Sequence, residues 1–196
     1  MRRMSFLVLS VALMSSLVAL ADDATAPPPP AEGGSVFRQP GGLLDRSPQR
    51  RSQELSFFLG LPYDYFYYGF GVGVGARYYI PILHDGFIPA VNDEFGIEFG
   101  ADFTAAFGGY FLPVIDIPVE VMWNFHFTPK FSAYAKVGIA LELSIYSNAY
   151  LTYSAGTHVG VIPVSGVGLH YKLSDSVNLR VEVGYPWVKV GLGFNL

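Results

Sequence analysis

The sequence predicts an all-β protein, a closed antiparallel transmembrane β-barrel of about eight strands in an up-and-down meander. Charged residues make up only 14% of the chain and hydrophobic residues 51%, whereas a typical soluble domain has about 25% charged residues. After the first 21 residues no apolar stretch is long enough for a spanning helix, and from Glu54 onward the pattern has period two. Because every backbone polar group in hydrocarbon must be paired, strands cross a membrane only as a closed barrel.

Residues 1–21 have the features of a cleaved signal peptide. Arg2 and Arg3 form the positive region, an apolar run follows, and Ala19-Leu20-Ala21 fits the cleavage pattern. We therefore expect export to the bacterial outer membrane. Cysteine is absent, which excludes lipidation, disulfides and thiolate metal sites. Cleavage removes both arginines and changes the formal net charge from −4 to −6, which argues against a nucleic-acid partner.

Residues 22–53 differ in composition from the rest of the mature chain. They contain the tetraproline 27–30, the glycine pair 41–42 and the basic pair 50–51. This composition predicts a disordered periplasmic tail that acts as a flexible spacer in preference to a binding motif. The barrel is expected over residues 54–196.

Eight segments of the barrel region are expected to be strands. In the clearest of them, Phe95, Ile97 and Phe99 alternate with small or charged residues. Two segments alternate poorly: the first is short, and the sixth is interrupted by Pro163 and glycines. The predicted strands are 54–61, 67–80, 94–106, 114–127, 131–146, 158–172, 177–185 and 188–196.

Charged residues predict which face of the strands points inward. Between residues 94 and 185, the nine charges clear of strand ends all have even numbers, so one face is free of charge. The second face is mostly Gly, Ala and Ser with few charges, which suits a narrow lumen better than a water-facing surface. The residues expected to form an ionic cluster in the lumen are Arg77, Glu98, Asp102, Asp116, Glu120, Lys136, Glu142, Lys172, Arg180, Glu182 and Lys189.

This cluster has two interpretations. It is either a structural plug of paired charges or a polar path for small solutes, and the plug is favoured because eight strands leave little free bore. Lys136 is expected to pair with Glu120 or Glu142 across neighbouring strands.

Turn lengths and aromatic residues predict an orientation. The connections 128–130 and 174–176 are tight and are assigned to the periplasmic side. The connection 81–93 is long on that same side, which the sequence does not explain. Trp123, Phe125 and Phe127 are expected in one interfacial aromatic girdle. The other girdle is expected from Tyr63, Tyr65, Tyr67, Tyr68, Tyr146, Tyr150, Tyr153, Tyr185 and Trp187.

The last strand carries a family resemblance. Its alternation of Val188, Val190, Leu192, Phe194 and Leu196 resembles the C-terminal strand of bacterial outer-membrane barrels, although that family usually ends in Phe. The region 54–196 is similar in architecture to the small OmpA, OmpX and OmpW class. The resemblance implies insertion into outer-membrane lipid and recognition by the barrel-assembly machinery through Phe194 and Leu196.

The sequence offers no specific catalytic, cofactor or metal-binding pattern. His126, His158 and His170 have no serine nucleophile and orienting acid at an informative spacing, and no His or carboxylate cluster has ligand spacing. We therefore expect a barrel that is not an enzyme and has a structural or surface-interaction role. A narrow channel for small solutes is the alternative, and a lipid-modifying enzyme is less favoured.

Overall fold

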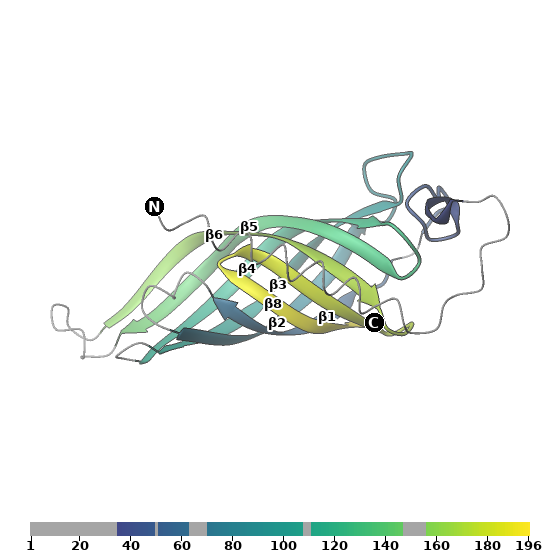
Figure 1. Cartoon of the computed structure of the whole chain (residues 1–196). Helices are drawn as coiled ribbons and strands as arrows, with labels where there is room; N and C mark the ends of the chain where they lie inside the picture. The colour runs from purple at the N-terminus through teal and green to yellow at the C-terminus, as the bar shows by residue number, and fades with distance from the viewer. Residues whose placement is uncertain (1–34, 50, 63–69, 108–110, 147–155) are drawn as a thin grey trace, which may run out of the picture. The chain divides into compact units, whose positions relative to one another are not determined.

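A computed structural model describes residues 35–49, 51–62, 70–107, 111–146 and 156–196. Eight antiparallel strands form a closed barrel in which each strand pairs with its neighbours in the chain (Figure 1). This confirms the predicted fold class, including the two poorly alternating strands. The described residues contain no helix with the length and hydropathy needed to cross a membrane. The elements are η1 (Val36–Arg38), β1 (Glu54–Pro62), β2 (Phe70–Leu83), β3 (Asp93–Phe107), β4 (Phe111–His126), β5 (Phe131–Tyr146), β6 (Gly156–Lys172), β7 (Val177–Tyr185) and β8 (Trp187–Asn195).

The barrel closes between its first and last strands. β8 pairs with β7 on one side and with β1 on the other, from Glu54 opposite Asn195 to Pro62 opposite Trp187. Closure gives both outer strands of the meander a hydrogen-bonding partner, so neither is left as a sheet edge.

Strand length differs around the barrel. β1, β7 and β8 each have 9 residues, whereas β2 to β6 have 14 to 17. β6 pairs with β7 only from Ser165 onward, and its first residues pair with β5 alone. Pro163 lies in that first part, where its missing N–H group breaks no ladder to β7. This explains how a strand with an internal proline is tolerated.

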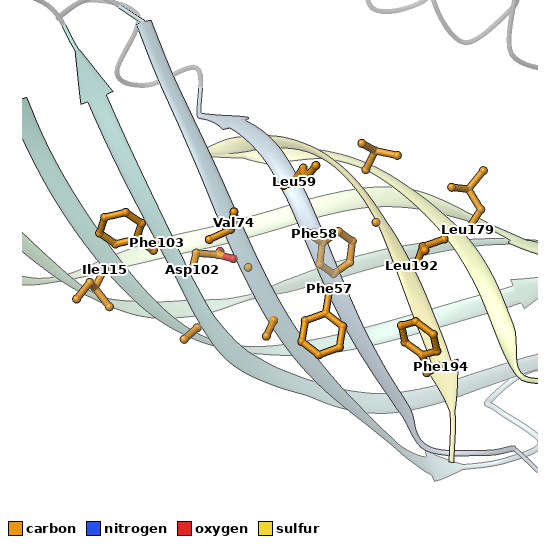
Figure 2. A pocket seen from close by; sticks show the side chains of 15 residues that line it. Phe57, Phe58, Leu59, Val74, Asp102, Phe103, Ile115, Leu179, Leu192 and Phe194 are labelled. Carbon is orange, nitrogen blue, oxygen red and sulfur yellow. The ribbon is translucent and has the colours of Figure 1, made fainter.

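The two faces of the strands have opposite character. Outward side chains are large, apolar and exposed, among them Val119 at 51% and Ile139 at 60%. Inward side chains include charged residues that are almost fully buried, such as Glu98 and Arg180 at 0%. Figure 2 shows an apolar hollow of about 850 Å³, lined mostly by outward side chains of β1, β2, β3, β4, β7 and β8, with the inward residues Phe58 and Asp102 also in its lining. The predicted period of two therefore separates an apolar exterior from a charged interior.

The two tight connections lie at the same end of the barrel, which we call the short-turn end. After β4, the N–H groups of Phe127 and Thr128 donate to the carbonyl of Phe131 at 3.0 and 3.1 Å. After β6, the N–H group of Leu173 donates to the carbonyl of Val177 at 2.9 Å. Both short connections match the prediction.

The long connection at this end, after β2, is shorter than the sequence indicated. β2 continues to Leu83 through a register shift after Pro81, so residues 84–92 form the connection. It turns at Gly86, whose φ of +57° favours glycine. The carboxylate of Asp93 then accepts a hydrogen bond from the N–H group of Phe87 at 3.0 Å.

Residues 35–49 and 51–53, which we call the N-terminal strap, are hydrogen-bonded to this connection and to Phe127, the residue after β4. The N–H group of Leu43 donates to the carbonyl of Phe127 at 3.2 Å, and the carbonyl of Leu43 accepts from Asn92 at 2.7 Å. Gln49 N–H donates to Asp85 Oδ1 at 3.0 Å. The prediction of a disordered tail over 22–53 therefore does not describe these residues, because the 84–92 connection supplies hydrogen-bonding partners that composition cannot reveal. Residues 22–34 and Arg50 lie outside the described residues.

A tight internal turn shapes the strap. Gly41 has a φ of +78°, and its N–H group donates to Asp45 Oδ2 at 2.7 Å. This backbone hydrogen bond, with a second from Ser47, holds the pKa of the Asp45 carboxyl below its usual value.

Aromatic side chains of the first predicted girdle lie together at one end, whereas one tryptophan of the second lies inside the barrel. At the short-turn end, Trp123 contacts Phe125 and Phe87, with ring centroids 4.9 and 5.8 Å apart. Trp187, expected in the opposite girdle, is 3% exposed and lies inside the barrel. The inward residues of β8 have odd numbers, so Trp187 shares the face of Lys189. The expected girdle residues Tyr63, Tyr65, Tyr67, Tyr68, Tyr150 and Tyr153 lie outside the described residues, as does the side chain of Tyr146.

Candidate functional site: the charged interior of the barrel

The interior contains most of the charged residues singled out from the sequence. Arg77, Glu98, Asp102, Asp116, Glu120, Lys136, Arg180, Glu182 and Lys189 are each 0 to 5% exposed. Glu142 is half-buried. Lys172 lies apart from the others near the 174–176 turn, where its side chain is 40% exposed and its Nζ is 2.8 Å from Asp175 Oδ1.

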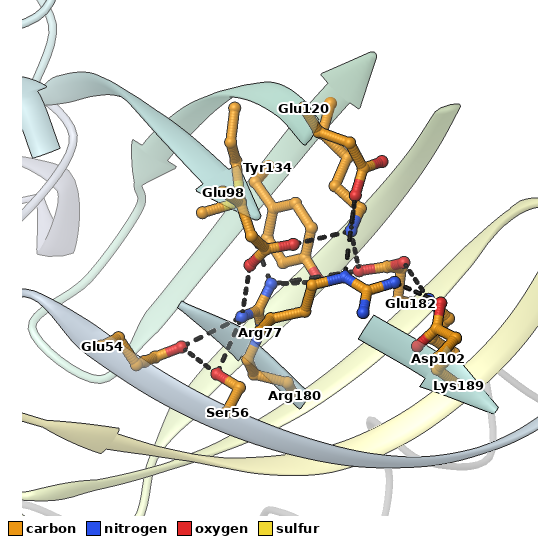
Figure 3. A network of polar contacts seen from close by, with 12 residues as sticks. Glu54, Ser56, Arg77, Glu98, Asp102, Glu120, Tyr134, Arg180, Glu182 and Lys189 are labelled. Carbon is orange, nitrogen blue, oxygen red and sulfur yellow. Dashed lines mark hydrogen bonds and ion pairs between the residues drawn. The ribbon is translucent and has the colours of Figure 1, made fainter. Parts of the chain in front are cut away.

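Lys136 on β5 is one centre of this interior. Its Nζ lies 2.7 Å from Glu98 Oε1, 2.9 Å from Glu120 Oε2 and 2.9 Å from Glu182 Oε2. Figure 3 labels these three carboxylates and marks contacts of the network with dashed lines. Glu98 and Glu120 are directly opposite each other on β3 and β4, an arrangement of like charges that is destabilising by itself. The ammonium between them compensates this repulsion. Of the two partners expected for Lys136, Glu120 is a contact, and the further contacts are Glu98 and Glu182.

Arg180 on β7 is the second centre. Its Nη1 donates to Glu98 Oε2 at 2.7 Å and to Glu54 Oε1 at 3.1 Å, and its Nη2 donates to the Tyr134 hydroxyl at 3.2 Å. The guanidinium also lies over the ring of Phe58, 4.9 Å from its centroid. A planar, always charged group with five donors suits such a crowded site. We call Lys136, Arg180, Glu54, Glu98, Glu120 and Glu182 the central network.

Sequence reasoning missed several members of this interior. Glu54, Ser56 and Phe58 share the inward parity of β1, and Tyr134 shares that of β5. Glu54 stands at a strand end, where parity is a weak guide. Counting the strand-end charges of the same parity would have found it.

A second group of contacts surrounds Asp102 on β3. Its Oδ2 is bound by Arg77 Nη2 and lies 3.1 Å from Lys189 Nζ. The ammonium of Lys189 also lies 5.1 Å from the ring of Trp187. A Cβ atom on Gly73 would overlap that ring, so the small inward residue on β2 makes room for the tryptophan.

Three carboxylates stand in one row across β3, β4 and β5. Asp102 is directly opposite Asp116, and Asp116 is directly opposite Glu142. We call these three residues the acidic row. Asp102 Oδ1 and Asp116 Oδ1 are buried without a hydrogen-bond partner in the described structure, as is the hydroxyl of Thr104 beyond Asp102. Asp102, at one end of the row, has the nearby cations Arg77 and Lys189, whereas Asp116 stands between two other carboxylates.

The short-turn end holds a polar cavity of about 270 Å³, lined in part by Arg51 of the strap, Glu94 and His126. His126 Nδ1 is 3.0 Å from Ser132 Oγ, and His126 Nε2 is 3.4 Å from Glu94 Oε2. Ser132 is directly across the β4–β5 ladder from His126. The sequence did not reveal this contact because strand register brings the two together.

The other two histidines weighed from the sequence lie elsewhere. His170 packs its ring 4.7 Å from that of Tyr134, and His158 is exposed near the start of β6. Within the described residues, no three His, Asp or Glu side chains are grouped so that they could hold a metal ion.

The interior leaves little free space at its middle. The cavity beside Arg77, Asp116 and Trp187 measures about 10 Å³, close to the minimum for one water molecule. In the part of the chain that the structure describes, the central network places paired charges beside this small cavity.

Comparison with known proteins identifies the fold. No protein-family model and no curated protein matches the chain. Among solved structures, the attachment invasion locus protein Ail of Yersinia pestis is 11% identical, with 75% of this chain and 100% of that chain covered and a TM-score of 0.51. The N-terminal β-barrel domain of Pseudomonas aeruginosa OprF is 16% identical, with coverage of 76% and 100% and a TM-score of 0.47. The likeness to Ail shows that this chain has the fold of the small eight-stranded bacterial outer-membrane barrels.

Proposed function

We propose that the protein is an integral outer-membrane barrel with a structural or surface-interaction role and a lumen closed by its own side chains. The observation that carries the proposal is the central network, in which Lys136 and Arg180 are 5% and 0% exposed and bind carboxylates from several strands. A filled bore transmits no solute, whereas an apolar exterior needs lipid.

The outward face supports membrane insertion. Exposed Val, Ile, Leu and Phe side chains cover it, and its hollow on β1, β2, β3 and β8 suits acyl chains. A strand of 9 residues is about 30 Å long and spans roughly 20 Å at a 45° tilt, close to the apolar band of such barrels. The short turns and the strap then face the periplasm.

Heat-modifiable migration tests insertion and closure. The folded barrel should resist SDS and migrate differently from the boiled chain, because its strand ladder is closed. Identical migration of boiled and unboiled protein under several detergent conditions would contradict a closed membrane barrel.

Conductance separates the plug from the alternative, a narrow channel. In a planar bilayer the purified protein should give no stable ohmic current. The 270 Å³ cavity at the short-turn end is the feature that favours the channel, since it admits solutes part of the way. Reproducible single-channel steps in the unmodified protein, seen again in the control variant Asp175→Asn, would favour the channel and count against the plug.

The surface role concerns the end opposite the short turns. Ail was crystallised with a sulfated sugar that mimics heparin. The connections 63–69, 108–110 and 147–155 of this chain contain no lysine or arginine and are rich in tyrosine. Their composition supports a neutral or cationic partner. Salt-sensitive retention on a heparin column would oppose this proposal.

Export and assembly complete the proposal. Mass spectrometry of the purified protein should give a chain that begins at Asp22, after cleavage of residues 1–21. Recognition by the barrel-assembly machinery through Phe194 and Leu196 predicts that Phe194→Ala lowers the amount of assembled barrel in the membrane. An unchanged level in that variant would remove this role of the last strand.

We also infer that the protein is not an enzyme, because Ser132 and His126 are a directly opposed cross-strand pair whose hydrogen bond satisfies two inward polar groups. A serine-directed fluorophosphonate should leave the folded protein unlabelled. Labelling that Ser132→Ala abolishes would reverse this conclusion.

A further inference from the structure

The N-terminal strap carries an apolar patch that the barrel leaves exposed. The turn at Gly41 folds the strap back on itself, and the N–H group of Leu44 donates to the carbonyl of Phe37 at 2.7 Å. Phe37 and Leu44 are 45% and 42% exposed, and Val36 beside Phe37 is exposed as well. We call Val36, Phe37 and Leu44 the strap patch. Exposed apolar side chains that gather in this way indicate a contact surface.

The strap patch is continuous with the aromatic residues at the short-turn end. The N–H group of Leu43, next to Leu44, donates to the carbonyl of Phe127 at 3.2 Å. Phe127 is a member of the first predicted girdle, and its ring centroid lies 6.0 Å from that of Phe131. The carbonyl of Leu43 accepts a hydrogen bond from the last residue of the 84–92 connection. The strap therefore meets the barrel where aromatic side chains are typical of a membrane interface.

The 84–92 connection extends the same apolar rim. Phe87 is exposed, and its ring centroid lies 5.0 Å from that of Phe95 and 5.8 Å from that of Trp123. Phe95 and Trp123 are outward residues that are directly opposite each other on β3 and β4. The strap and the connection thus meet the same part of the girdle, where β3 begins and β4 ends.

Positive charge accompanies the strap patch. The strap and Arg50 within it contain four arginines and one acidic residue, Asp45. Arg38 and Arg46, which follow the apolar residues in the chain, are exposed, as is Lys130 in the neighbouring turn. Asp45 accepts hydrogen bonds from backbone N–H groups of the strap itself. Arginines beside apolar side chains suit a lipid surface, because lipid phosphates accept their hydrogen bonds while the apolar groups enter the interface.

We propose that the strap patch enters the phospholipid leaflet at the short-turn end, with Arg38 and Arg46 at the lipid phosphates. The strap then holds this end of the barrel to the membrane surface, by burial of apolar groups together with attraction to anionic lipid. The proposal rests on the membrane insertion given above as the proposed function, and it does not depend on whether the lumen conducts.

Quenching of a fluorescent dye in lipid nanodiscs tests the proposal, because both faces of the disc are open to solvent. The chain has no cysteine, so Leu44→Cys gives a single site for an environment-sensitive dye. Val119→Cys reports the outward wall, and Ser176→Cys reports the polar turn at the short-turn end. Lipids with a spin label on the acyl chain should quench the dyes at positions 44 and 119 several-fold more than the dye at position 176.

A second site guards against loss of the strap in the labelled variant. Val36→Cys places the dye elsewhere in the strap patch and leaves Leu44 in place. It should be quenched as strongly as Leu44→Cys.

Anionic lipid tests the arginines. Replacement of phosphatidylcholine by phosphatidylglycerol should increase the quenching at position 44. Arg38→Gln in the labelled protein should lower the ratio of lipid-bound to free strap about fivefold, as expected for one basic side chain at an anionic surface. Lys172→Gln is the matched control, because it removes a charge of the same sign at the same end, where Lys172 lies 2.8 Å from Asp175. It should leave the quenching unchanged.

The outcomes separate this proposal from membrane insertion itself. Quenching at position 119 without quenching at positions 44 and 36 would overturn the strap proposal and leave insertion standing. No quenching at any of the three positions would mean that the wall does not face lipid, and both proposals would fail.

Two further results would count against the strap proposal. A dye signal at position 44 that rises with protein concentration in detergent, with low quenching in nanodiscs, would assign the strap patch to contact with a second copy of the chain. Equal effects of Arg38→Gln and Lys172→Gln would remove the contact between the strap arginine and the lipid phosphates.

Discussion

The central network and the acidic row both face inward, but they depend differently on closure of the barrel. The contacts of the central network join strands that are far apart in the sequence, whereas the acidic row lies on neighbouring strands. Lys136 and Arg180 bind carboxylates of β1, β3, β4 and β7, and these strands meet only because the barrel is closed. The acidic row lies on three consecutive strands, and at its end Asp102 is bound by Arg77 and Lys189. The comparison teaches that the inward position of a charge is local, whereas its neutralisation depends on strands far apart in the sequence.

The largest expected effect comes from breaking the central network. Lys136→Met leaves Glu98, Glu120 and Glu182 without their shared ammonium, and removal of one partner of a buried pair typically costs about 3 to 5 kcal/mol. Urea unfolding in lipid vesicles measures this loss. Asp116→Asn, in the acidic row, should be neutral or stabilising, because it removes a charge that stands between two other carboxylates. Equal losses in the two variants would remove the distinction between the two regions.

A double change sharpens the same comparison. Lys136→Met with Glu120→Gln should cost less than the sum of the single changes, because the glutamine leaves no unpaired charge. Lys136→Met with Asp116→Asn should be nearly additive. Additivity in both doubles would mean that the contact between Lys136 and Glu120 contributes little to stability.

The next effect compares the inward and outward faces. Val119→Arg places a charge on the apolar exterior and should cost about 2 to 4 kcal/mol near the bilayer midplane. Ala140→Ser, on the inward face next to the small cavity, should be almost neutral. The same unfolding titration measures both, and similar losses would contradict the assignment of faces.

A smaller effect is expected where Trp187 fills the lumen. Gly73→Ala would force its Cβ against the Trp187 ring, and overpacking typically costs about 1 to 3 kcal/mol. Gly160→Ala meets only the ring edge of His158, at 3.1 Å, and is the matched control. A Trp187 fluorescence spectrum that stays unchanged in Gly73→Ala, together with unchanged stability, would place the tryptophan elsewhere.

The smallest effect concerns the N-terminal strap. The side chain of Asn92 donates to the carbonyl of Gly42 at 3.2 Å and accepts a hydrogen bond from Arg51. Asn92→Ala should cost about 1 kcal/mol and should make the strap cleavable by protease while the barrel stays resistant. Protection of the strap in this variant would show that Asn92 does not hold it.

The sequence by itself determined the strands and their faces. A period of two is a local property of the backbone, so the even-numbered charges of β3 to β7, apart from Lys172 at the end of β6, could be placed inside before any contact was known. The same logic applied with the parity of β8 would have placed Trp187 beside Lys189. Pro163 does not interrupt β6, because the residues of β6 before Ser165 are hydrogen-bonded to β5 alone.

Only the tertiary structure decided which charges meet and what covers the short-turn end. Arg180 and Glu54 are 126 residues apart, and their contact depends on the closing ladder between β8 and β1. The strap has the composition of a spacer, yet it is ordered by hydrogen bonds to the 84–92 connection. Both outcomes have the same physical reason: alternation fixes the direction of a side chain along its own strand, while its partners come from the register and closure of the whole barrel.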